Sequence, residues 1–276
     1  MRPIRTIAVF PTLLTLGNLL CGFFAIVVAA RIEKPISDYS ISGDVLSGDA
    51  RHLMISGCLI FLAMVFDGLD GYVARLARTT SDFGAQLDSL CDVVSFGVAP
   101  GFLLVKMCPR FTLSHDQAVW IIAAAFAACA ALRLARFNVE TGDDDEHMYF
   151  SGLPSPAAAA VIAGFAIMFH SLRQDISSAP LKEFVDKYLQ LGLPFFALAV
   201  ALLMVSRVRY PHITNRVLRG QRSFGHVVAV VFFFVAIMLV RGYALPIAAS
   251  AFVLYGPVHL AWERWVERRH REEPLF

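Results

Sequence analysis

The chain contains eight apolar stretches, each about as long as a helix that crosses a membrane. The hydrocarbon core of a bilayer is ~30 Å thick, so a crossing helix needs about 20 apolar residues. Within lipid, each such segment must pair its own backbone polar groups, which it does as a helix. The sequence therefore predicts an all-α, polytopic membrane bundle of about eight transmembrane helices, at residues 9–30, 52–75, 84–106, 117–137, 154–172, 191–206, 223–241 and 243–262.

Composition excludes the other broad classes of protein. Of the 276 residues, 57% are apolar and only 17% are charged, which is too apolar for a soluble domain of this length. The formal net charge of +2 is too small for a nucleic-acid-binding protein, so no nucleic acid partner is expected. Arg2, Arg5 and the pair Leu20-Cys21 resemble a lipoprotein signal, but Leu20 is too large for cleavage before the cysteine. We expect the first helix to be retained.

The distribution of basic residues predicts the orientation of the bundle. With the N-terminus in the cytosol, most of the 24 lysine and arginine residues fall on the cytosolic side. Cytosolic loops are enriched in these residues, so both termini are predicted to be cytosolic. The expected location is the cytoplasmic membrane, as a multi-pass protein in contact with membrane lipids.

Four aspartates lie in the cytosolic parts of the second and third predicted helices. An ionised aspartate in hydrocarbon costs several kcal/mol, so such a residue indicates a functional site. Asp67 and Asp70 are three residues apart, and Asp88 and Asp92 are four apart, so each pair shares one helix face. In an antiparallel hairpin Asp67 falls at the depth of Asp92, and Asp70 at the depth of Asp88. Asp67 and Asp92 then lie roughly 12 Å from the turn. We expect the four carboxylates to converge between the two helices.

Close carboxylates repel one another unless cations lie among them. An all-oxygen cluster suits Mg²⁺ or Mn²⁺, and the motif has no histidine or cysteine at a fixed position to favour zinc. Carboxylates that bridge two such cations are a usual means of stabilising charge on a phosphate during a displacement. Gly71, Ala74 and Gly84 keep the helix surfaces small for a bulky ligand, and Arg75 offers a planar donor fork for a phosphate oxygen.

The pattern D-x2-D-G-x2-A-R-x8-G-x3-D-x3-D resembles the signature of the CDP-alcohol phosphotransferases at every fixed position. These positions are Asp67, Asp70, Gly71, Ala74, Arg75, Gly84, Asp88 and Asp92.

The resemblance implies transfer of a phosphatidyl-type group from a CDP-linked lipid, CDP-diacylglycerol, to an alcohol, with release of CMP. It also implies that the four aspartates hold two divalent cations, Mg²⁺ or Mn²⁺, and that Asp92 is the base for the acceptor hydroxyl. The implied residues of the CDP-lipid site are Asn18, Asp70, Gly71, Ala74, Arg75, Ser81 and Gly84. For Asn18, a hydrogen bond between helices is the alternative.

Three further segments resemble the serine-using subfamily. They are Pro11-x3-Thr15-x2-Asn18-Leu19, Leu134 to Asn138, and Gly152 to Ala158; Thr12 stands where that subfamily usually has asparagine. The implied acceptor is therefore L-serine, with choline, glycerol 3-phosphate or an inositol phosphate as alternatives. Serine brings a carboxylate, for which Arg133 and Arg136 are the nearest candidates, although both also suit the role of membrane anchor.

We expect one integral membrane catalytic domain over residues 1–276. Residues 1–190 would form the family core with the active site facing the cytosol, and 191–276 would add C-terminal helices. The oligomeric state is left open, and a homodimer is one of the states considered. An ion or proton transporter is the alternative of a different class, but it leaves the glycine, alanine and arginine positions of the motif unexplained.

The predicted topology can be tested with accessible tags. Tags on the N-terminus and on the C-terminus should both be protected in right-side-out vesicles, while a tag near Ser42 should be accessible to an impermeant reagent. Accessibility of either terminus would show that the number of crossings has been miscounted.

Overall fold

The computed structural model describes residues 9–32, 43–77, 82–109, 111, 116–140, 149–175, 179–211 and 241–272. Nearly all of them are helical. The elements are α1 (Val9–Ala30), α2 (Gly43–Ala77), α3 (Asp82–Asp92), the π-helix η2 (Val93–Val98), α4 (Ala99–Met107), α6 (Asp116–Glu140), β1 (Tyr149–Ser151), α7 (Ser155–Asp175), α8 (Ala179–Val205), β2 (Arg209–Pro211), the 3₁₀-helix η3 (Arg241–Tyr243) and α11 (Ala244–Glu272).

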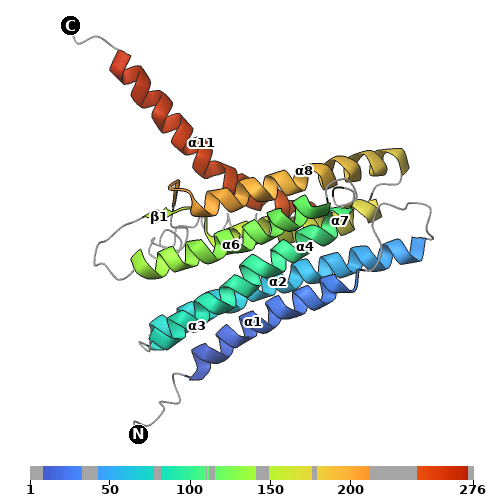
Figure 1. The fold of residues 1–276 in the computed structure, drawn as a ribbon, viewed down its shortest axis with the longest axis horizontal. Coiled ribbons are helices and arrows are strands. Elements are labelled where there is room, and N and C mark those ends of the chain that lie inside the picture. The colour runs from blue at the N-terminus through green and yellow to red at the C-terminus, as the bar shows by residue number, and fades with distance from the viewer. Residues whose placement is uncertain are drawn as a thin grey trace, which may run out of the picture.

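Within these residues, seven helical spans are long and apolar enough to cross a membrane, which confirms the prediction of a polytopic helical bundle. The predicted segment 223–241 lies outside the described residues. The sixth crossing begins earlier than predicted, since its span runs over Phe184–Val205, and Pro194 lies inside α8 as it lay inside the predicted segment. Most of the helices run side by side, and α11 leaves the bundle at an angle (Figure 1).

The third crossing is one continuous rod made of α3, η2 and α4. Pro100 stands near the start of α4, where it has no backbone N–H to donate and its ring crowds the preceding turn. The turn before it is widened into the π-helix Val93–Val98, which begins directly after Asp92. A π-helical turn of this kind is frequent at functional sites. Here it separates the helix that carries Asp88 and Asp92 from the buried segment that anchors it.

Small residues let α1 approach this rod closely. A Cβ atom added at Gly22 would lie 2.7 Å from the Cα of Ser95, so only glycine fits there without a shift of the backbone. The Ser95 hydroxyl donates to the backbone carbonyl of Asn18 over 3.0 Å, and the Ser56 hydroxyl of α2 donates to that of Ala25 over 2.9 Å. In membranes, small residues and hydroxyl hydrogen bonds hold helices together. Both fix α1 against the helices that carry the aspartates.

A two-stranded antiparallel sheet, which the sequence did not predict, joins β1 to β2. Its register pairs Tyr149 with Pro211, Phe150 with Tyr210, and Ser151 with Arg209. The sheet lies at the same end of the bundle as the start of α3, the start of α1 and the far end of α11 (Figure 1). The sheet, the starts of α1 and α3, and the end of α11 are therefore gathered at one end of the bundle.

Gly22→Ala tests how tightly α1 must approach the rod. We expect a lower unfolding temperature and reduced turnover, because the added methyl group pushes α1 away from Ser95 and from Asp92. Overpacking of this kind costs about 1–3 kcal/mol. The control is Gly192→Ala, since a Cβ added at Gly192 meets nothing within 4 Å. Equal behaviour of the two variants in thermal unfolding and activity would contradict the prediction.

Candidate active site

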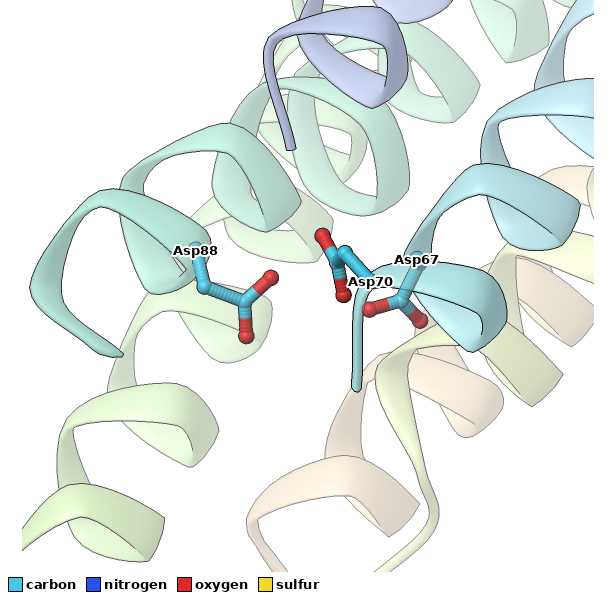
Figure 2. Close-up of side chains that lie close together, drawn as sticks. All are labelled: Asp67, Asp70 and Asp88. Carbon is cyan, nitrogen blue, oxygen red and sulfur yellow. The ribbon is translucent and has the colours of Figure 1, made fainter. Parts of the chain in front are cut away.

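Three of the predicted aspartates converge. One oxygen from each of Asp67, Asp70 and Asp88 lies within 4.8 Å of the others. Asp67 and Asp70 project from α2 and Asp88 from α3, and the three carboxylates turn toward a common centre (Figure 2). The antiparallel α2–α3 hairpin thus brings together side chains that are about 20 residues apart in the sequence, as the matching depths predicted.

Two oxygens of this cluster are buried without a hydrogen bond: Oδ2 of Asp70 and Oδ1 of Asp88. Asp70 is only 5% exposed, and its carboxylate accepts hydrogen bonds from the Thr15 hydroxyl and the Gly71 backbone N–H. A buried charged oxygen without a partner is costly. A divalent cation would neutralise the repulsion and pair both oxygens, so the donor set fits Mg²⁺ or Mn²⁺.

Asp92 lies one turn further along α3 and has a partner of its own. The side-chain amide of Asn18 donates to Oδ1 of Asp92 over 2.9 Å, and both residues are buried. The charges of Asp67 and Asp88 act on Asp92. Asp92 does not belong to the group of three carboxylates whose oxygens lie close together. Asn18 therefore contacts the predicted base through a hydrogen bond between helices, which is the alternative that the sequence left open, and its contact with the CDP lipid stays a prediction. Oδ1 of Asn18 is buried without a hydrogen bond.

The two predicted acceptor arginines lie differently. The charge of Arg133 acts on Asp92 and Asp67, and its Nη1 atom donates to the Ser155 hydroxyl over 2.7 Å. Arg136 donates to the backbone carbonyl of Val205, at the end of α8, over 3.2 Å. The charge of Arg133 thus acts on two of the four aspartates. The acceptor-binding role of both arginines stays a prediction.

Two polar pairs that stabilise the site were not predicted from the sequence. Asn138 of α6 donates to the Ser89 hydroxyl of α3 over 2.9 Å, and Ser155 accepts from Arg133. Both Asn138 and Ser155 lie in segments that resemble the serine-using subfamily. That resemblance could have indicated them, but it does not say which side chains meet.

The predicted CDP-lipid residues are only partly described. A Cβ added at Gly71 would meet nothing within 4 Å, and the same holds for Gly68, so there is open space beside this turn of α2. Gly84 lies in the first turns of α3. Ala74 and Arg75 lie on α2, but their side chains are outside the described part, and Ser81 is outside it altogether.

Residues 8–208 match the family described as CDP-alcohol phosphatidyltransferase. The chain belongs to this family. The expectation drawn from the motif is thereby confirmed, and the match covers the aspartates, both arginines and the helices from α1 to α8. This family typically depends on a metal, and the three converging aspartates could bind one.

Curated relatives carry related names. A CDP-diacylglycerol–serine O-phosphatidyltransferase of Methanocaldococcus jannaschii is 38% identical over 182 residues, which is 66% of this chain and 76% of the relative. A protein of the same name from Helicobacter pylori is 30% identical over 268 residues, covering 96% of this chain and 94% of the relative. An archaetidylserine synthase of Methanothermobacter thermautotrophicus is 35% identical over 157 residues, 56% of this chain and 57% of the relative.

Replacing Asp67 or Asp88 with asparagine should abolish turnover and weaken the binding of Mn²⁺, measured by calorimetry or by electron paramagnetic resonance. Each change removes one negative charge from the cation site. Asp49→Asn is the matched control, because Asp49 lies about 27 Å from Asp67 along α2. Activity that survives EDTA, or Mn²⁺ affinity unchanged in both variants, would exclude a metal site at the three aspartates.

Proposed function

We propose that this protein is a CDP-diacylglycerol–serine O-phosphatidyltransferase, which transfers a phosphatidyl group from CDP-diacylglycerol to L-serine and releases CMP. The observation that carries the proposal is the meeting of three carboxylates, two of them with a buried unpaired oxygen, near an arginine whose charge acts on Asp92 and Asp67. Relatives that align over nearly the whole chain carry this activity in their names. An acceptor with a carboxylate, such as serine, would be bound by the Arg133 guanidinium.

Asp67, Asp70 and Asp88 would hold the divalent cations in this proposal, with Asp92 as the fourth predicted ligand. Two cations, Mg²⁺ or Mn²⁺, would neutralise the pyrophosphate of the donor and stabilise the CMP that leaves. The open space beside Gly68 and Gly71 leaves room for the donor headgroup next to the three aspartates. Arg75 and Ser81 stay predicted contacts of that headgroup.

Asp92 is the proposed general base. A serine hydroxyl is a weak nucleophile until it loses its proton, and a carboxylate of Asp92 would accept that proton. The hydroxyl oxygen forms a bond to the phosphorus of the phosphatidyl group while the bond from this phosphorus to the CMP oxygen breaks. CMP leaves with that electron pair. Asn18 has a role here as well, since its amide fixes the Asp92 carboxylate and keeps its orientation constant between turnovers.

Arg133 is the proposed acceptor ligand. Its guanidinium is close enough to Asp92 and Asp67 to interact with their charges, so a serine carboxylate bound to Arg133 would place the serine hydroxyl near the base. Arg133 would also offset part of the negative charge of the aspartates before the donor arrives. Arg136, which holds the end of α8, would support this arrangement from the side.

We further propose that the protein lies in the cytoplasmic membrane with both termini and the active site facing the cytosol. The start of α1 and the far end of α11 lie at the end of the bundle that holds the aspartates, which supports this orientation (Figure 1). The oligomeric state stays open, with a homodimer as one of the predicted states. Membership in a transferase family argues against the transport hypothesis.

The function is tested with purified protein, CDP-diacylglycerol and a panel of radiolabelled alcohols. Serine should give a labelled phospholipid and CMP, while choline, glycerol 3-phosphate and inositol phosphate should give none. Use of another alcohol in place of serine would overturn the acceptor assignment and leave the metal chemistry intact.

Arg133→Lys should raise the KM for serine about tenfold and leave the KM for CDP-diacylglycerol nearly unchanged. Lysine keeps the charge but loses the planar fork that pairs with a carboxylate, and hydrogen bonds to charged groups are worth this order of magnitude. Arg31→Lys is the matched control, because Arg31 is exposed and directly follows α1, at the other end of that helix from its start near the aspartates. Equal small changes in both KM values would mean that Arg133 is only a membrane anchor.

A further inference from the structure

The segment Gly152 to Ser155, here called the strap, joins the sheet to α7 and ends at the first residue of that helix. Its last residue, Ser155, is fully buried and accepts the hydrogen bond from Arg133. The strap therefore contacts the side chain that the proposed function assigns to the serine carboxylate. The position of the strap therefore affects the position of the Arg133 side chain, through the hydrogen bond to Ser155.

The end of α8 holds the strap by its backbone. Gly152 donates to the carbonyl of Val208 over 2.9 Å, and Leu153 donates to that of Leu203 over 3.1 Å. Gly152 has a φ of +89°, a conformation that favours glycine, and a Cβ there would overlap the carbonyl of Met204. The strap is thus seated against residues 203–208, with no room for another side chain at position 152.

Tyr210 connects this assembly to α11. It pairs with Phe150 across the sheet and is fully buried. Its hydroxyl donates to the backbone carbonyl of Val253 over 2.9 Å, and its ring covers Gly256 so closely that a Cβ there would overlap it. Burial raises the pKa of Tyr210 to about 12, so the phenol stays protonated and able to donate.

The match to the family ends at residue 208, so Tyr210 and α11 lie beyond the part that defines the family. A contiguous set of contacts nevertheless runs from α11 through Tyr210 and the sheet to the strap, and from Ser155 to Arg133. The proposed transfer chemistry uses the aspartates and Arg133, and it gives these C-terminal residues no step of their own.

We propose that Tyr210 and Ser155 are positioning residues for the acceptor: α11, through Tyr210, fixes the strap, and Ser155 of the strap holds the Arg133 guanidinium in the orientation that binds the serine carboxylate. The inference rests on the proposed function, and specifically on the role of Arg133. It assigns the C-terminal helix to acceptor binding, with the CDP-lipid side of the site independent of it.

The test compares Ser155→Ala and Tyr210→Phe in the full-length purified enzyme. Ser155→Ala should raise the KM for serine about tenfold, and Tyr210→Phe about threefold, because each removes one hydrogen bond and the first bonds a charged group. The KM for CDP-diacylglycerol should stay within error in both. The matched controls are Ser171→Ala, about 24 Å along α7 from Ser155, and Tyr255→Phe, on α11 and half exposed.

A double-mutant cycle with Arg133→Lys separates positioning from general stability. If Ser155 acts through Arg133, then Ser155→Ala in the Arg133→Lys background should add little to the KM for serine. The shift in unfolding temperature caused by saturating serine gives a second readout of acceptor binding and should shrink in the same variants. Should Tyr210→Phe not yield monodisperse protein, Gly256→Ala disturbs the same contact from α11.

The outcomes are distinguishable. Arg133→Lys with no effect on the KM for serine would overturn the acceptor assignment, and this inference with it. An effect of Arg133→Lys together with unchanged serine KM values in Ser155→Ala and Tyr210→Phe would overturn this inference alone. Additive effects in the cycle, or equal increases in both KM values, would show that the strap and α11 act only on overall stability.

Discussion

The arrangement of this bundle depends on the cost of placing several carboxylates in one small volume beside lipid. Asp67, Asp70 and Asp88 repel one another, and two of their oxygens have no partner among the described residues. Such a cluster persists only when the surrounding helices hold it together and a cation offsets its charge. Three features help to meet this requirement. Gly22 lies close against Ser95, the Thr15 hydroxyl bonds Asp70, and the charge of Arg133 acts on Asp67. The rest of the described bundle provides the rigid frame.

Sequence reasoning was strongest where a physical rule acts locally. Apolar runs of about 20 residues predict crossings, and seven spans among the described residues agree with them. The spacing of Asp67, Asp70 and Asp88 predicted their convergence, because helical periodicity and an antiparallel hairpin fix it. The start of α8 lies before the predicted segment, because its first turns mix charged and apolar residues and so do not form a continuous apolar run.

Contacts between residues distant in sequence were beyond such reasoning. No local pattern reveals that the amide of Asn18 reaches Asp92, that Arg133 meets Ser155, or that Tyr210 meets Val253. The pairing of β1 with β2 joins two three-residue strands almost 60 residues apart, too short for any alternation of apolar and polar residues to appear. Residue identity showed which side chains are chemically capable, and packing of the helices decided which of them meet.

The amide of Asn18 has a consequence for the proton that Asp92 would carry. An amide has a donating face and an accepting face, whereas an ionised carboxylate only accepts and a protonated one also donates. The observed contact, with the NH₂ group toward Asp92, suits the ionised form. After a half-turn of the amide about the Cβ–Cγ bond of Asn18, its oxygen would accept from the protonated form. Asn18 is thus chemically able to stay bonded to Asp92 before and after proton transfer, and its second face is the oxygen that otherwise lies buried without a partner.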